Sequence, residues 1–370
     1  MLQIKSQTIT PIQNAILNLF HALWLKQKTI LLKELMGIKN FWSMVAHSVF
    51  CKPEKNNGIY ANIFNIILYV TYTTRGRIQE IDMVFDKMFA DSTDFVKMWT
   101  SHIMDSLTEP TTMTDGIYIL MSWRNLIITA QKYHPKCLQN SVVQILAENC
   151  INGLIQCYPW PNNIRICQIW TELYLFLITN CKSASYQERT SLDVLTKIYE
   201  QLIVDYFSMS HTCKKYFMSI AINTIKYFGL NIEDNIFDIE KFLYLIGLIF
   251  QMEFKDVTTA YTGNDANEYV IWHLLLIFGN VLLKMKFQEV LPRWFIQTRF
   301  VYSIVTAIRP FLKNQVLFPL AKESIHCLLN CADSQLIEDF LYVDIDLLFS
   351  DIEPPLHIYN TKEINSQVNL

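Results

Sequence analysis

The chain has 370 residues, of which 51% are hydrophobic and 18% are charged, and its formal net charge is −3. This length can bury a large core, but it exceeds the size at which one compact core usually keeps growing, so we expect two domains or an elongated stack. The near-neutral charge excludes a global field that would draw the chain onto nucleic acid or an anionic membrane, which makes proteins the expected partners.

Residues 10–50 form the first predicted element, a pair of helices joined by a tight connection. Thr10 is a predicted N-cap, and Pro11 follows at the first helical position. Apolar residues then recur at three-to-four spacing in two stripes, which are Ile12, Ala15, Ile16, Leu19, Leu23 and Trp24, and then Ile30, Leu31, Leu35, Phe41, Trp42, Val45 and Val49. Neither helix can bury its stripe alone, so each must pack against a neighbour.

The same spacing predicts helices along the rest of the chain as far as Phe349. Their ranges are 59–73, 78–90, a helix that contains 95–103, then 115–130, 138–158, 164–179, 192–206, 213–228, 236–252, 265–286, 293–308, 316–331 and 334–349. The predicted N-caps are Ser92, Thr114 or Asp115, Ser185 with Glu188, and Asp265 with Glu268. Residues 351–370 are acidic and contain proline, and we expect this tail to be frayed.

The strongest break in the helical pattern is Pro159-Trp160-Pro161. Two prolines cannot continue a helix, and each restricts the residue before it. We therefore expect a bend or a domain boundary at residues 159–162.

Scarce glycine and proline, at 9 and 11 residues, predict an all-α protein. About sixteen helices of roughly 12 to 22 residues with short connections must pack antiparallel to their neighbours. Helix pairs recur at about 40 residues, the period of armadillo or HEAT-like units. The sequence thus predicts a single irregular α-solenoid over residues 1–350, with a globular helical bundle as the alternative.

Two sparsely charged stretches, 58–74 and 271–283, raise the question of a membrane span. Polar residues interrupt both, and neither supplies the roughly 18 to 20 apolar residues that cross a bilayer. We therefore expect no transmembrane segment, and the polar first ten residues argue against a signal peptide. The nine cysteines lie mostly in apolar runs, where reduced thiols pack as small apolar groups.

The chain contains no GxxxxGK[ST], GxGxxG, HExxH or GxSxG motif, so we expect no enzyme, no catalytic residue and no cofactor. Two clusters that contain cysteine are candidate sites. His326, Cys327 and Cys331 offer ligands within about one helical turn, but no second pair has matching spacing, so packed thiols are expected instead of a metal site. His134 and Cys137 bracket a Pro-Lys turn that would suit a poised thiolate, but a helix joint is the expected role.

Two charged clusters are further candidate sites. The first is an acidic end that would suit a divalent cation. Apolar residues are interleaved with these carboxylates, so the polar side of a terminal helix is expected instead. The cluster comprises Asp344, Asp346, Asp351 and Glu353. The second, around residues 284–313, would suit an acidic peptide or nucleic acid, but its spacing covers several faces and predicts a solvated surface. It comprises Lys284, Lys286, Arg293, Arg299, Arg309 and Lys313, with Trp294 and Phe300 interleaved. No metal ligand and no partner-binding residue is assigned.

One segment carries a resemblance to a known family. Residues 15–50 contain an apolar helix ending in Leu23-Trp24, a Lys-rich joint, a leucine-rich helix, and then Phe41-Trp42 before a short helix that ends at Phe50. This order resembles a segment of the inner-ring scaffold nucleoporins, in particular the 188-kilodalton nucleoporin family. Those scaffolds are irregular α-solenoids several times longer than this chain, so the resemblance covers only an internal portion of them.

The resemblance implies a non-catalytic structural subunit of the nuclear pore complex at the nuclear envelope, which supports nucleocytoplasmic transport of protein and mRNA. It implies binding to other scaffold and linker nucleoporins through short helical segments in solenoid grooves, and contact with FG-bearing segments or transport receptors. No direct nucleic-acid partner and no small-molecule substrate are expected. The alternative is a HEAT-like adaptor or nuclear transport receptor that binds protein cargo.

Overall fold

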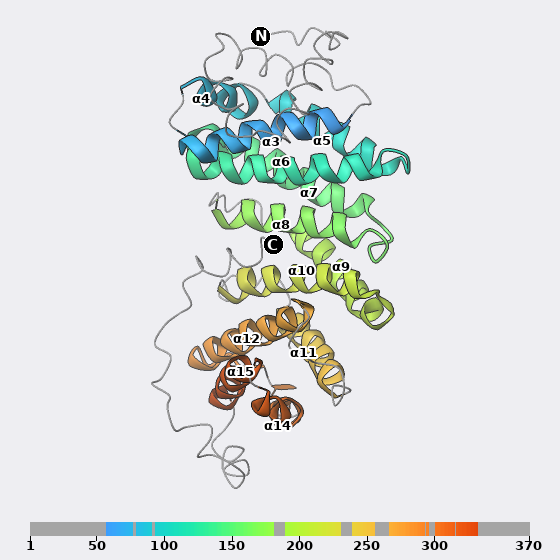
Figure 1. Cartoon of the computed structure of the whole chain (residues 1–370), viewed down its shortest axis with the longest axis vertical. Helices are drawn as coiled ribbons and strands as arrows, with labels where there is room; N and C mark the ends of the chain where they lie inside the picture. The colour runs from blue at the N-terminus through green and yellow to red at the C-terminus, as the bar shows by residue number, and fades with distance from the viewer. Residues whose placement is uncertain are drawn as a thin grey trace. The chain divides into compact units, whose positions relative to one another are not determined.

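The structure is a computed structural model that describes residues 57–76, 79–90, 93–180, 189–230, 239–255, 266–292, 294–295, 300–314 and 316–331. In these residues it contains twelve α-helices and no strand (Figure 1), which confirms the all-α class. The predicted total of helices and the HEAT-like type stay predictions. The helix pair at 10–50, the helix at 334–349 and the acidic end at 344–353 lie outside the described residues.

Contacts between Cα atoms divide the chain into two compact units, Met1–Phe242 and Leu243–Leu370. The predicted single solenoid over residues 1–350, with a bend at 159–162, stays a prediction. The two units are described in turn below.

The first unit is built from helices joined by short connections. They are α3 (Asn57–Thr74), α4 (Gln79–Phe85), α5 (Thr93–Thr108), α6 (Met113–Tyr133), α7 (Asn140–Gln156), α8 (Ile164–Asn180), α9 (Arg189–Asp205), α10 (His211–Leu230) and the start of α11 (Ile239–Lys255). A π-helical turn, Asp86–Ala90, follows α4, and 3-10 turns at Pro135–Cys137 and Tyr206–Ser208 precede α7 and α10. The helix positions thus follow the apolar spacing closely.

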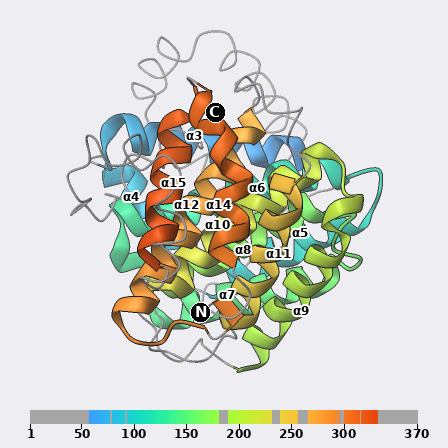
Figure 2. The ribbon, with the colours of Figure 1, turned by 90° about the horizontal axis from the view of Figure 1, so that it is seen from below.

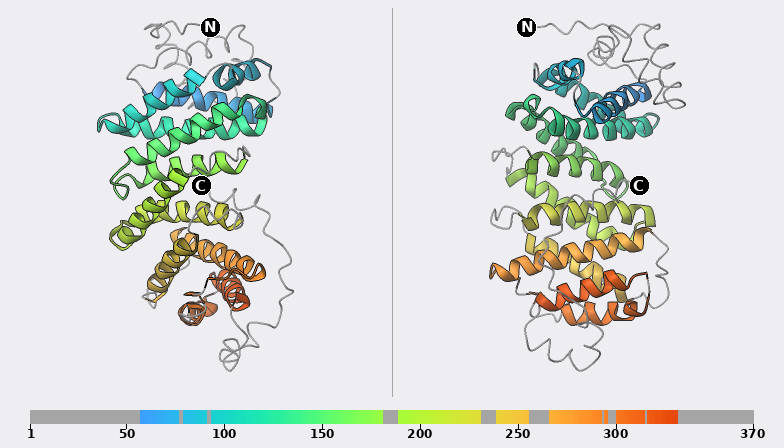
Figure 3. Two further views of the ribbon diagram at one scale, coloured as in Figure 1. Left: turned by 180° about the vertical axis from the view of Figure 1, so that it is seen from behind. Right: turned by 60° about the vertical axis from the view of Figure 1, so that its left-hand side comes forward.

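These helices form two layers. The first layer is α3, α6, α8 and α10, in which each helix packs against the next, and the second layer is α5, α7 and α9 (Figure 3). Each second-layer helix is followed by a first-layer helix; α5 packs on α6 and α7 on α8, and Tyr199 of α9 shares a 2.7 Å hydrogen bond with Thr224 of α10. Figure 2 shows α5 and α9 to the right of α6, α8 and α10. The predicted pairing of neighbouring helices is therefore present in this unit.

Large aromatic side chains fill the space between the layers. Trp99 of α5 is fully buried, and its ring centroid lies 4.9 Å from those of Tyr60 and Phe64 on α3. Trp170 of α8 packs so closely on Gly153 of α7 that a Cβ atom there would lie 2.5 Å from the indole ring. The spacing of large and small residues therefore sets how closely the layers approach.

Two local predictions need correction. The predicted caps Thr114 and Asp115 are not at the start of α6, because this helix begins at Met113 after Thr112. The Thr112 hydroxyl donates to the carbonyl of Ser106 (2.9 Å) and does not cap the helix. The predicted single helix at 78–90 changes to a π-helical turn after Phe85.

The second unit contains most of α11, then α12 (Ala266–Phe287), α14 (Phe300–Ile308), a 3-10 turn at Arg309–Lys313, and α15 (Phe318–Cys331). α12 packs along α15, and both α14 and the 3-10 turn contact α15. The ring of Trp272 on α12 lies 5.0 Å from that of Phe254 and 5.4 Å from that of Phe311. Aromatic contacts therefore join α12 to α11 and to the 3-10 turn.

The apolar stretch predicted at 271–283 is longer than expected, so the prediction that it is too short to span a membrane is wrong. Within the described residues, Val270–Phe287 of α12 is long and apolar enough by length and composition. More than half of this stretch is buried, however, and the core helix of a globular protein passes the same test. Trp272 and Phe278 both pack against aromatic rings of other helices, so we treat α12 as a core helix.

Candidate functional site

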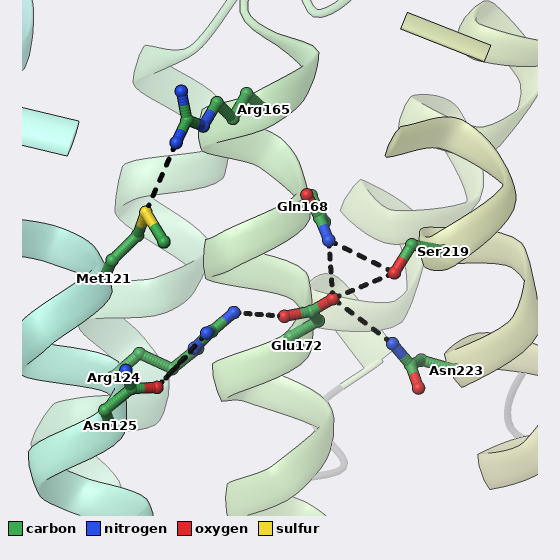
Figure 4. Close-up of polar contacts among 8 residues, drawn as sticks. All are labelled: Met121, Arg124, Asn125, Arg165, Gln168, Glu172, Ser219 and Asn223. Carbon is green, nitrogen blue, oxygen red and sulfur yellow. Dashed lines mark hydrogen bonds and ion pairs between the residues drawn. The ribbon is translucent and has the colours of Figure 1, made fainter. Parts of the chain in front are cut away.

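A cluster of polar side chains crosses the first layer from α6 through α8 to α10 (Figure 4). We call its five members the polar seam; they are Arg124, Gln168, Glu172, Ser219 and Asn223. Glu172 of α8 lies at the centre. One of its carboxylate oxygens pairs with Arg124 of α6, and the other accepts hydrogen bonds from Gln168 (2.8 Å), Ser219 (3.0 Å) and Asn223 (3.4 Å).

The seam is partly buried, and this makes its contacts energetically important. The side chains of Arg124 and Glu172 are each 19% exposed. Hydrogen bonds to a charged group contribute about 1.5–3 kcal/mol each, and removing one member of a buried pair leaves the other charge uncompensated. The bonded residues lie on three different helices, so the seam fixes how these helices sit along one another.

Arg165 lies beside the seam, near the start of α8. Its guanidinium donates to the sulfur of Met121 (3.5 Å) and lies 6.0 Å from the ring centroid of Tyr216 (Figure 4 shows the Met121 contact). No carboxylate among the described residues pairs with it. The half-buried cation thus rests on a thioether and an aromatic face, one from each neighbouring helix.

Lys226 is a second half-buried cation of the first layer, on α10. Burial lowers its pKa, because the ammonium loses part of its hydration. No described residue hydrogen-bonds to it or pairs with it. Arg165 and Lys226 are therefore available to pair with an anion.

The two layers differ in charge. The first-layer helices contain six Lys and Arg against two Asp and Glu, whereas the second-layer helices contain three against six. A layer with this excess of positive charge attracts acidic groups.

The structure does not support a poised thiolate at Cys137. His134 is paired through Nδ1 with Asp82 (2.6 Å) and stacks on Phe85, with ring centroids 4.5 Å apart. Burial lowers the pKa of His134, which the Asp82 and Asp86 carboxylates only partly offset. Burial and Asp86 raise the pKa of Cys137 to about 12, so the thiol stays protonated, and the 3-10 turn here is a helix joint.

The cysteine pair on α15 packs against α12. Cys327 lies 3.7 Å from the side-chain oxygen of Asn280, and Cys331 lies 3.6 Å from the carbonyl of Gly279. Burial raises the pKa of both thiols, to about 12 for Cys327. His326 contacts Asn330, and no three His, Cys, Asp or Glu side chains gather as a metal site anywhere in the described part of the chain.

Four of the six basic residues at 284–313 lie among the described residues. Lys286 donates to the carbonyl of Asn330 (2.9 Å) near the end of α15, while Arg293 and Arg299 lie outside the described residues. Trp294 packs edge-on against Tyr244 and Phe300, with ring centroids 5.4 and 5.7 Å away. These aromatic rings contact one another and do not alternate with cations in the pattern of a nucleic-acid surface.

The polar seam was missed in the sequence because its members come from three helices, and the bonded pairs on different helices are 47 to 51 residues apart. The available signal was Glu172, a lone carboxylate between Ile169 and Ile178 in an otherwise nearly apolar helix. Such a residue must find a partner, but the sequence does not say on which helix.

The chain is 24% identical to the nucleoporin Nup188 of Drosophila melanogaster over 264 residues, which cover 67% of this chain and 14% of that protein. The chain therefore spans only a small part of the length of this relative. No family model and no solved structure matches the chain. The predicted resemblance to a portion of a scaffold nucleoporin is confirmed.

Proposed function

We propose that this chain is a non-catalytic scaffold segment of the nuclear pore complex, located at the nuclear envelope. The observation that carries the proposal is its similarity to Nup188 over 67% of the chain. The layered helix pairs of the first unit support it, because stacked pairs expose long faces that suit binding to other proteins.

The proposed partners are other scaffold and linker nucleoporins of the inner ring, bound through short helical segments, with FG-bearing segments or transport receptors as further contacts. In this role the chain supports transport of protein and mRNA between nucleus and cytoplasm. A scaffold of this kind needs stable helix packing and exposed binding faces, and it needs no catalytic group.

Localisation and co-purification test the proposal together. The chain carrying a fluorescent tag should give a nuclear-rim signal and co-purify with nucleoporins, while the tag alone should do neither. A signal spread through the cytosol with no nucleoporin co-purifying would reject the scaffold role. Binding to a GTP-loaded small GTPase in a pull-down would instead indicate a transport receptor.

A further inference from the structure

We propose that the exposed face of α6, α8 and α10 binds an acidic segment of a partner protein, with Arg165 and Lys226 as the cations that pair with its carboxylates. The proposal rests on the proposed function, in which the chain acts by binding proteins, and it adds where binding occurs and what the partner must carry. Three observations support it.

The first observation is the position of Arg165. Its guanidinium is held by contacts with Met121 (3.5 Å) and Tyr216 (6.0 Å to the ring centroid), yet none of the described carboxylates pairs with it. An arginine stacked on neighbouring side chains is pre-organised, so it loses little conformational freedom when it binds a carboxylate bidentately. Arg165 is therefore a suitable anchor for an aspartate or glutamate.

The second observation is that Lys226 provides a further cation on the same layer. It is half-buried, and no described residue hydrogen-bonds to it or pairs with it. Burial has already removed part of its hydration, so a carboxylate that reaches it meets a smaller desolvation cost. A segment that crosses the layer can therefore meet a cation on α8 and another on α10.

The third observation is the charge of the layer as a whole. α6, α8 and α10 contain six Lys and Arg, and their acidic residues are Asp115 and Glu172. Asp115 lies in the first turn of α6, and Glu172 is already neutralised by Arg124 and satisfied by three further hydrogen bonds. The polar seam therefore does not repel an approaching carboxylate, and the positive charge of the face remains.

The surroundings of Arg165 also indicate what lies beside the carboxylate of the partner. Tyr118 of α6 is 54% exposed, and Met121 and Tyr216 are half-exposed next to the guanidinium. Apolar and aromatic surface of this kind favours a segment in which acidic residues alternate with leucine or phenylalanine. A nucleic acid fits less well, because the whole chain has a net charge of −3.

A synthetic peptide of alternating glutamate and leucine, labelled with fluorescein, is the probe. Its binding to the full chain is measured by fluorescence anisotropy at physiological ionic strength, beside matched peptides with glutamine or lysine in place of glutamate. We expect only the glutamate peptide to bind, and Arg165→Met or Lys226→Met to weaken its binding by about tenfold or more. Lys97→Met and Lys197→Met, which remove exposed second-layer lysines, should change the affinity less than about twofold.

A charge-reversal variant distinguishes a loss of binding from a loss of folding. Arg165→Glu should no longer bind the glutamate peptide and should bind the lysine peptide instead. Thermal melting checks that each variant is folded. Equal binding by all variants would overturn the proposal, as would tighter binding of a uridine oligonucleotide than of the peptide. The nuclear-rim signal tests the two proposals separately. If the scaffold role is wrong, the unaltered chain gives no rim signal. If only the binding of an acidic segment is wrong, the unaltered chain and Arg165→Met both keep the rim signal.

Discussion

The two layers of the first unit share one architecture but use their charged residues differently. In the first layer, Glu172 is largely buried and bonded across three helices. In the second layer, Glu200 pairs with Lys241, and these side chains are 39% and 51% exposed. Pairs exposed to this extent are screened by water and contribute little, whereas a partly buried pair must be kept intact.

The difference shows how a chain with an almost neutral composition has layers of opposite charge. The first unit contains a layer with excess positive charge packed on a layer with excess negative charge, and this separation does not appear in the net charge of −3. Charge that is separated in this way gives one face to acidic partners and the other to basic ones. The predictions below test this contrast.

The largest effect is expected at the polar seam. Glu172→Ala should reduce the free energy of unfolding by about 2–4 kcal/mol, because Arg124 is left half-buried without its carboxylate and three donors lose their acceptor. The measurement is a urea unfolding curve.

Glu200→Ala in the second layer is the matched control, since it removes the same side chain from an exposed pair and should cost less than about 1 kcal/mol. If the two variants lose equal stability, the layers do not differ in how they use charge. The double variant Arg124→Met/Glu172→Ala should recover part of the loss, because it removes the unpaired cation as well.

A smaller loss is expected where the layers meet. Gly153→Ala would place a Cβ atom 2.5 Å from Trp170, and such overpacking costs about 1–3 kcal/mol even though alanine favours a helix. Thermal melting of Gly153→Ala, Trp170→Phe and the double variant measures the coupling. If the two losses simply add, the close contact of α7 with α8 is not what sets the spacing of the layers.

Much of the fold could be predicted from the sequence because helix formation is local. The three-to-four spacing of Leu195, Tyr199 and Leu202 predicts one buried stripe, and all three are buried. The same spacing does not fix the caps. Thr112 uses its hydroxyl on the preceding helix, and this depends on contacts that local spacing does not specify.

The layers and the seam could not be predicted, because they depend on contacts distant in sequence. Arg124 and Glu172 are 48 residues apart, and neither residue alone identifies the other as its partner. Residue spacing shows that a helix needs a neighbour, but it does not show which side chains of two helices meet. The positive charge of the first layer could not be predicted from the total charge either, because it depends on which helices pack together.

Acidification tests whether the contrast between the layers is one of surface charge or of buried groups. Burial lowers the pKa of both His102 and His134 from the ordinary value of 6.5, so the unfolded chain binds more protons just below that pH. Stability should therefore be fully present above about pH 6.5 and fall as the pH drops towards the lower pKa values of the folded state.

We expect a modest fall in melting temperature between neutral pH and about pH 5.5 that added salt does not remove. His134→Phe, which keeps a ring against Phe85, should reduce this fall. A fall that salt abolishes, or that the variant leaves unchanged, would assign the acid sensitivity to the charges of the layers.

The smallest effect on stability is expected from thiol modification, which distinguishes buried from partly exposed cysteines of the first unit. Burial raises the pKa of Cys150 on α7, and a hydrogen bond with Cys157 together with burial raises the pKa of Cys167 on α8. Both thiols are fully buried, so neither should react with iodoacetamide in the native state. Cys213, at the partly exposed start of α10, should react readily, and mass spectrometry locates the label. Because its side chain already meets solvent, labelling should leave the melting temperature unchanged, whereas rapid labelling of Cys150 would mean that the layers separate easily in solution.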